Sequence, residues 1–274
     1  MADRGRRNSR PDRADDPPVG SSLSAFAAQG YFAASRRPLE ILFFLLPFIA
    51  FYEYELVKVL RSERGLLTNE AHRGLLDLFG AFGLDGLALS LPGFLLVAVF
   101  LAWHALTRGP WIVNLSVVAR MFVESLAAAV PLLVFSQVVL QAVPAAAVDE
   151  FASLSLGEQV AVSVGAGLYE ELVFRMALIG LLLFVFADLL KAPKAWAHAI
   201  AIGLSALAFT VYHPLRGDDG LLVPQRFVFY LGAGVYFGVL FTVRGFGIAA
   251  AAHAMYDIAT ALLVAGALEP AAAS

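Results

Sequence analysis

Hydrophobic positions fall into seven long runs, at about residues 39–59, 87–106, 117–141, 159–189, 195–213, 227–243 and 246–268. A helix that crosses about 30 Å of hydrocarbon needs roughly 20 mainly apolar residues, and each run reaches or approaches that length. Between the first two runs, residues 61–86 alternate leucines with charges and glycines, which favours an interfacial or re-entrant segment. The pattern predicts an all-α polytopic membrane protein, a bundle of about seven to eight transmembrane helices.

The composition excludes several other classes. The chain is 60% hydrophobic and only 15% charged, far from the composition of a soluble globular protein. Its net charge is -3, and beyond the N-terminal region no basic patch is dense enough to indicate nucleic acid as a partner. The absence of cysteine excludes disulfides, a cysteine nucleophile and thiolate metal sites. We therefore expect the lipid bilayer as the protein's surroundings.

The chain divides into a polar tail and two groups of helices. Residues 1–38 mix arginine with Asp, Pro, Gly and Ser and are too polar to bury a core, so we expect a disordered cytoplasmic tail. Residues 39–145 form the N-terminal transmembrane helices with the interfacial loop. Residues 146–270 form a C-terminal helical core, and most of the polar residues inside the hydrophobic runs belong to it.

Basic residues near the ends of membrane spans favour the cytoplasmic side. A cytoplasmic N-terminus places several of them on that same side: Arg108, Arg120, Lys191, Lys194 and Arg244. The acidic 142–158 loop then lies outside. Three arginines also fall outside, which counts against the scheme: Arg61, Arg64 and Arg73. We predict a multi-pass protein of the plasma or inner membrane with its N-terminus in the cytoplasm.

The fourth run contains three charged residues, Glu170, Glu171 and Arg175, inside an apolar sequence. Ionisable side chains at membrane depth are costly and usually mark a functional site. Glu171 and Arg175 are four residues apart, so they share a helix face and can pair. Glu170 points about 100° round the helix and has no partner in its own segment. Since poor solvation makes a carboxylate a stronger base, we expect Glu170 to act as a general base.

The fifth and seventh runs each contribute a histidine. Phe209 and His213 share one face of the fifth run, and His253 and Asp257 are four apart in the seventh. An aspartate one turn along a helix can hold an imidazole in one tautomer. Singly, each histidine is as readily a packing residue as a functional one. With the unpartnered Glu170, the set of polar groups on three helices favours a catalytic site inside the C-terminal four helices.

Three short motifs follow one another on these helices. They are Glu170-Glu171-Leu172-Val173-Phe174-Arg175, Phe209-Thr210-Val211-Tyr212-His213 and His253-Ala254-Met255-Tyr256-Asp257. In this order they resemble the CAAX protease and bacteriocin-processing family, also called CPBP or Abi, of intramembrane endopeptidases, over about residues 160–260. The family commonly has Asn at the last motif position, where this chain has Asp257.

The resemblance implies an intramembrane endopeptidase that cleaves a membrane-anchored peptide or protein near its C-terminus. Its substrates are either of the CAAX type, with a lipid group, or anchors processed in sorting systems. If the family's motif roles apply to the matching positions of this chain, Glu170 activates water, and His213 and His253 line the catalytic cavity. Glu171 and Arg175 support them, and Asp257 completes the expected catalytic set.

Two chemistries fit these residues. In one, Glu170 takes a proton from water directly, and the histidines donate to the oxyanion and to the leaving amine. In the other, a zinc ion held by Glu170, His213 and His253 activates the water. The chain has no His-Glu-x-x-His motif, which favours the chemistry without a metal. The expected cofactor is therefore either none or zinc.

Other interpretations remain open at this level. A proton-coupled transporter also places Glu and His in a bundle core, although no matching pair of broken helices appears in the two halves. A non-catalytic membrane scaffold is a further alternative. A rhomboid-like serine protease would have to use Ser205 with His253 and would leave the glutamates without a role.

Two spacings indicate structure rather than chemistry. Gly234 and Gly238 form a G-x-x-x-G motif, which predicts a close helix contact. Arg120 and Glu124 are spaced as an i,i+4 ion pair at the start of a helix.

Overall fold

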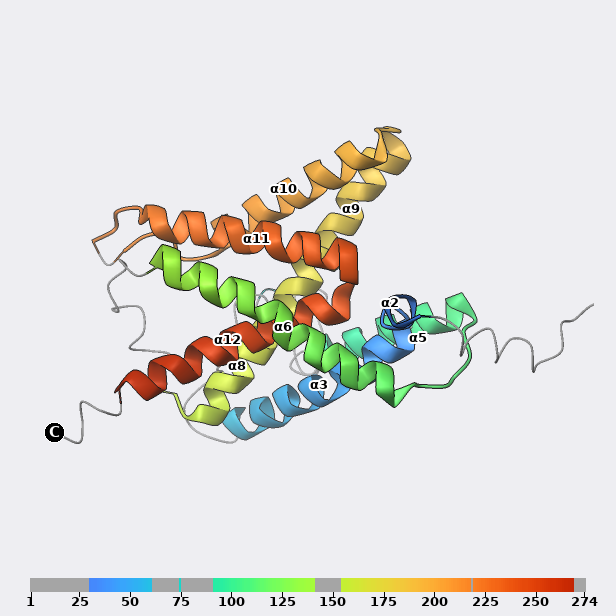
Figure 1. Cartoon of the computed structure of the whole chain (residues 1–274), viewed down its shortest axis with the longest axis horizontal. Coiled ribbons are helices and arrows are strands. Elements are labelled where there is room, and N and C mark those ends of the chain that lie inside the picture. The colour runs from blue at the N-terminus through green and yellow to red at the C-terminus, as the bar shows by residue number, and fades with distance from the viewer. Residues whose placement is uncertain (1–29, 61–73, 75–90, 141–153, 218, 269–274) are drawn as a thin grey trace, which may run out of the picture.

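The computed structural model describes residues 30–60, 74, 91–140, 154–217 and 219–268, and apart from an isolated bridge between Arg216 and Leu222 its regular structure is helical (Figure 1). The predicted 61–86 segment lies almost wholly outside these residues. The elements are α2 (Tyr31–Ala34), α3 (Pro38–Leu60), α5 (Leu91–Thr107), α6 (Leu115–Leu140), α8 (Leu156–Glu170), η3 (Glu171–Ile179), α9 (Gly180–Leu183), η4 (Phe184–Leu189), α10 (Lys194–Tyr212), α11 (Pro224–Arg244) and α12 (Phe246–Leu268). The all-α prediction is confirmed.

Each predicted hydrophobic run contains a helix. Within the described residues, five helical stretches are long and apolar enough to cross a membrane: Leu115–Leu140, Leu156–Leu189, Lys194–Tyr212, Pro224–Arg244 and Phe246–Leu263. The apolar part of α5, Gly93–Thr107, is shorter. The structure therefore supports a polytopic membrane bundle, with five candidate spans where the sequence predicts seven to eight.

Small residues bring the helices of the C-terminal half close together. A Cβ atom at Gly167 would lie 2.5 Å from the carbonyl oxygen of Ala250, so α8 and α12 pack backbone to backbone. Gly234 and Gly238 pack α11 on α10, since their Cβ atoms would lie 2.8 Å from Ala206 Cα and 3.0 Å from Ile202 Cγ2. The predicted G-x-x-x-G contact is confirmed, and these contacts set the spacing of the helices around the site.

The segment before α3 departs from the sequence prediction. Inside the tail predicted for residues 1–38, Tyr31–Ala34 form helix α2. The Tyr31 hydroxyl donates a hydrogen bond to the Glu124 carboxylate, which also accepts one from Arg244 Nη2 at 2.8 Å. Glu124 therefore pairs across the bundle, whereas Arg120 is exposed, so the expected Arg120 and Glu124 pair is wrong. The tail prediction fails here because α2 packs where α6 begins and α11 ends.

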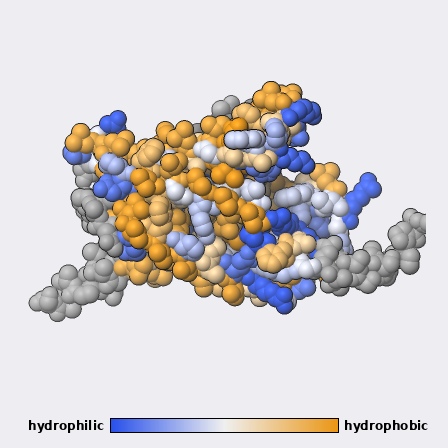
Figure 2. All heavy atoms as spheres, turned by 45° about the horizontal axis from the view of Figure 1, so that its top comes forward, coloured by the Kyte–Doolittle hydropathy of each residue, from blue (hydrophilic) through white to orange (hydrophobic). Residues whose placement is uncertain are grey.

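The two ends of the bundle differ in charge. We call the end where α3, α6, α10 and α12 begin and α5 and α11 end the basic end; it lies on the right in Figure 1. Hydrophilic residues gather mainly on that side in Figure 2, while the middle of the surface is hydrophobic. All three tryptophans lie there too, exposed: Trp103, Trp111 and Trp196. The described cations of the basic end are Arg36, Arg37, Arg108, Arg120, Lys191, Lys194 and Arg244; those of the opposite end are Lys58, Arg216 and Arg226.

Candidate active site

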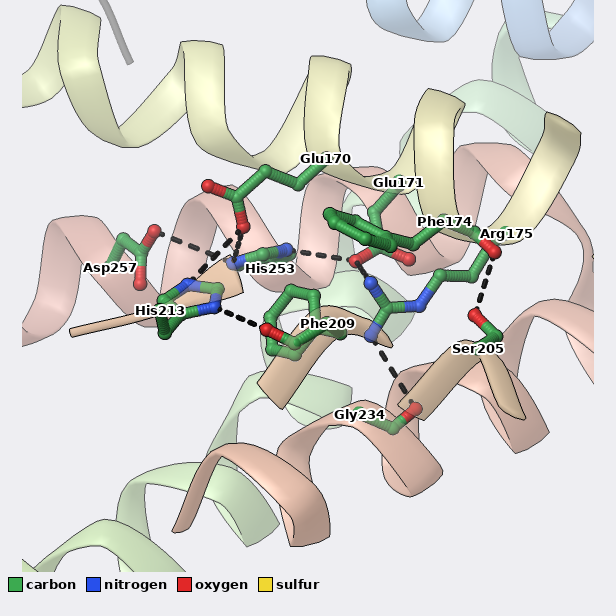
Figure 3. A network of polar contacts seen from close by, with 10 residues as sticks. All are labelled: Glu170, Glu171, Phe174, Arg175, Ser205, Phe209, His213, Gly234, His253 and Asp257. Atoms are coloured by element: carbon green, nitrogen blue, oxygen red, sulfur yellow. Dashed lines mark hydrogen bonds and ion pairs between the residues drawn. The ribbon is translucent and has the colours of Figure 1, made fainter. Parts of the chain in front are cut away.

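Glu170 and Glu171 lie where α8 becomes the π-helical segment η3. Such wider helical turns are rare and often occur at functional sites. The two carboxylates point to different partners, as Figure 3 shows: Glu170 faces the histidines and Glu171 faces Arg175. Both are buried, with side chains 7% and 0% exposed. Adjacent residues of one helix thus serve two different groups.

Glu171 holds two partners at once. Its Oε1 lies 3.2 Å from Arg175 Nη1 and accepts a hydrogen bond from His253 Nδ1 at 2.9 Å. Arg175 is fully buried, donates to the carbonyl oxygen of Gly234 at 3.4 Å, and places its Cζ 4.3 Å from the centroid of the Phe209 ring. The Glu171 and Arg175 pair expected from the sequence is present. It joins η3 to α10, α11 and α12.

Glu170 faces both histidines. Its Oε2 atom lies 3.6 Å from His213 Nε2 and 3.9 Å from His253 Nε2. This oxygen is buried and has no hydrogen-bond partner among the described residues. A buried acceptor without a hydrogen bond is costly, and such groups often mark a site of chemistry. The structure therefore brings together the three residues that sequence reasoning placed at the centre of the site.

The ring nitrogens of the histidines have distinct surroundings. His213 Nδ1 donates to the carbonyl oxygen of Phe209 at 2.8 Å, which leaves Nε2 facing Glu170. His253 Nδ1 is taken by Glu171, so its Nε2 faces Glu170 and Asp257, whose Oδ2 lies 3.6 Å away. The sequence assigned the orientation of His253 to Asp257, but the shorter contact comes from Glu171 on another helix.

Helix α11 supplies an aromatic face to each histidine. The Tyr230 ring stacks on His213, with centroids 4.2 Å apart and planes at 25°. Phe237 stacks on His253, with centroids 4.5 Å apart and planes at 19°. Sequence reasoning missed both residues. Their spacing of seven residues, about two helical turns, places them on one face of α11, but the same spacing is typical of ordinary core packing.

These groups surround one cavity of about 310 Å³. Its lining comes from α6, α8, α10, α11 and α12, so a helix of the N-terminal half completes a site whose polar groups all come from the C-terminal half. The lining residues are Leu132, Leu140, Glu170, Phe209, His213, Phe229, Tyr230, Ala233, Phe237, His253, Tyr256, Asp257 and Thr260. Nothing in the sequence distinguished Leu132 and Leu140 from lipid-facing leucines.

Ser205 does not join the site. Its Oγ donates to the carbonyl oxygen of Phe174 at 2.7 Å, on the far side of Arg175 from His253 (Figure 3). The hydroxyl therefore supports the η3 backbone. This geometry removes the serine-protease alternative.

The arrangement does not fit a bound metal ion. Among the described residues, no group of three or more His, Asp or Glu side chains is placed to hold one. The donor set of Glu170, His213 and His253 expected for zinc is close together but lacks the geometry of a metal centre.

Comparison with known proteins agrees with the motifs. Residues 152–259 match the model of the Rce1-like family of type II CAAX prenyl endopeptidases. Comparison with curated proteins and with solved structures finds no match. The matched segment runs from just before α8 into α12, and the buried Glu170 and Glu171 with their histidine partners lie inside it.

Proposed function

We propose, from one premise, how the chain cleaves its substrate. Residues 152–259 form an Rce1-like type II CAAX prenyl endopeptidase domain, which belongs to a family of intramembrane proteases. The proposed activity is hydrolysis of a peptide bond near the C-terminus of a membrane-anchored peptide or protein. One observation carries it: Glu170 Oε2, buried and without a hydrogen bond among the described residues, faces two imidazoles across a cavity.

Glu170 is the proposed general base. A water molecule beside Oε2 gives a proton to the carboxylate, and its oxygen attacks the carbonyl carbon of the substrate. The resulting oxyanion accepts a hydrogen bond from His253 Nε2 in its protonated form. When the C–N bond breaks, the proton taken by Glu170 reaches the leaving nitrogen through His213 Nε2, 3.6 Å from Glu170 Oε2. No step requires a metal.

Three further residues form the surroundings of His253. Glu171 accepts from His253 Nδ1 and so directs Nε2 towards the cavity. Arg175 balances the charge of Glu171 in a fully buried position. Asp257 faces His253 Nε2 and borders the space where the oxyanion forms.

The remaining chain is proposed as the scaffold and membrane anchor of this core. Residues 146–270 form the catalytic unit, and residues 39–145 complete the bundle, so that seven to eight segments cross or enter the membrane. The cations of the basic end favour a cytoplasmic N-terminus. The substrate is a membrane-anchored protein of the CAAX type, with its lipid group, or an anchor processed during sorting.

A cleavage assay tests the proposal. The full chain is purified in detergent and mixed with a library of membrane-anchored peptides, beside Glu170→Ala and His253→Ala. We expect cleavage by the parent protein, loss in both variants, and no effect of a chelator. Loss of cleavage with the chelator would contradict the mechanism without a metal. Full cleavage by Glu170→Ala would contradict the role of Glu170.

A library without cleavable members would give no product with any protein. A second assay therefore reconstitutes the chain in vesicles and measures proton flux. Flux that requires Glu170, without proteolysis of any membrane protein co-expressed with the chain, would favour the transporter alternative.

A further inference from the structure

The exposure of the site residues falls steadily towards the basic end. On α12, the side chain of Asp257 is 27% exposed, whereas that of His253, one turn nearer the basic end, is 6% exposed. Directly after α10, the His213 side chain is 16% exposed, and Phe209, one turn deeper on α10, is buried. Farther towards the basic end, the Glu171 and Arg175 side chains are 0% exposed and are not among the residues that line the cavity. The cavity therefore opens towards the opposite end of the bundle.

The positions of the outermost lining residues also indicate that the cavity opens towards the opposite end. Leu140 is the last residue of α6, His213 follows the last residue of α10, and Thr260 lies in the second half of α12. All three helices run from the basic end to the opposite end. Helix α11 starts at the opposite end, and Tyr230 lies six residues after its first residue. At a rise of 1.5 Å per residue, Tyr230 is therefore about 9 Å from the start of α11, in the direction of the basic end.

Among the described residues, the cations favour the basic end as the one that faces the cytoplasm. Positively charged residues concentrate at cytoplasmic span ends, and the basic end has most of those in the described chain. At the opposite end, Lys58 pairs with Glu55 at 3.0 Å, while Arg216 and Arg226 donate to carbonyl oxygens of the loop before α11 at 2.8 and 2.7 Å. The exposed tryptophans of the basic end mark a membrane interface there.

We infer that the catalytic cavity opens to the non-cytoplasmic side of the membrane, and that the substrate is an exported protein whose membrane anchor reaches the site from that side. The inference rests on the proposed peptidase function. It selects anchor processing over cleavage of a cytoplasmic lipidated C-terminus. The apolar and aromatic lining between the mouth and Glu170 suits the apolar residues at the outer boundary of a transmembrane anchor, and it gives them a path to the catalytic carboxylate.

The absence of cysteine makes the orientation directly measurable. Leu221→Cys places a thiol on the exposed loop of the opposite end, and Thr260→Cys places one in the cavity mouth. Ala195→Cys, exposed beside Lys194, is the matched control at the basic end. With a membrane-impermeant thiol reagent on intact cells, we expect labelling of the first two as complete as after permeabilisation. Ala195→Cys should label only after permeabilisation. The reverse pattern overturns the inference.

A pair of substrates separates this inference from the proposed function. Each membrane-anchored reporter is made in two orientations, with the same boundary residues facing the outside or the cytoplasm. We expect cleavage of the outward-facing form alone, and none with Glu170→Gln. Cleavage of the cytoplasmic form alone would overturn the inference and leave the peptidase intact. If neither form were cleaved while a purified substrate was, the proposed substrate class would be wrong and the peptidase would stand.

Discussion

His253 donates a hydrogen bond through Nδ1 to Glu171 Oε1 at 2.9 Å, and this contact gives two adjacent glutamates different tasks. With Nδ1 occupied, Nε2 faces Glu170, whose Oε2 has no hydrogen bond among the described residues. Glu171 thus belongs to a buried network with Arg175, whereas Glu170 is available for chemistry. The division can be tested by changing each carboxylate to its neutral amide.

Glu170→Gln should abolish cleavage while leaving the fold intact. Loss of a general base typically lowers a rate by about 10²–10⁴-fold. Because Gln has nearly the same shape, the thermal unfolding temperature in detergent should stay within a few degrees. Steady-state cleavage and a melting curve measure the two effects. Substantial cleavage by Glu170→Gln would show that another group activates the water.

Glu171→Gln should reduce stability as well as activity. The change leaves the Arg175 guanidinium buried without a counter-charge, and breaking a buried pair in this way typically costs about 3–5 kcal/mol. It also weakens the contact that orients His253. Comparison of the unfolding midpoints of Glu171→Gln and Glu170→Gln is the decisive measurement. Equal midpoints would contradict the assignment of separate tasks.

The helices were predictable because a membrane span needs a long apolar run, and such runs stand out in the sequence. The Glu171 and Arg175 pair was predictable because i,i+4 spacing is a local rule. The contact of Glu171 with His253 was not, since it joins residues 82 apart whose meeting depends on how α8 packs on α12. The same holds for Glu124, whose partner Arg244 lies on another helix.

The close packing of α8 on α12 gives a third prediction. Gly167→Ala should destabilise the protein, because the new Cβ would lie 2.5 Å from Ala250 O and 2.6 Å from Ala254 N. Overpacking of this kind costs about 1–3 kcal/mol, and the shift would move Glu170 away from His253. Gly180→Ala is the matched control, since nothing lies within 4 Å of its Cβ. A stable, active Gly167→Ala with an unchanged melting curve would refute the packing argument.

The aromatic face on His213 gives a fourth prediction. Tyr230→Phe keeps the ring and should retain cleavage, whereas Tyr230→Leu removes the stacking at 4.2 Å and frees the imidazole to turn. Aromatic contacts contribute about 0.5–1.5 kcal/mol, so kcat should fall by about two- to thirteenfold. The KM should change less than kcat in Tyr230→Leu. A loss equally large in Tyr230→Phe would point instead to a role for the hydroxyl.

The Asp257 position gives the last prediction. Asp257 Oδ2 lies 3.6 Å from His253 Nε2, the atom proposed to donate to the oxyanion, so the carboxylate competes with the oxyanion for that donor. Asp257→Asn removes the competing charge and adds an amide donor at the same place. We expect cleavage to be retained or raised, while Asp257→Leu, similar in size without polar atoms, should lower it. Cleavage rates with one substrate, measured beside melting curves, compare the two variants. Loss of activity in Asp257→Asn with the fold intact would show that the negative charge itself is required, and would assign Asp257 to holding His253 in its protonated form.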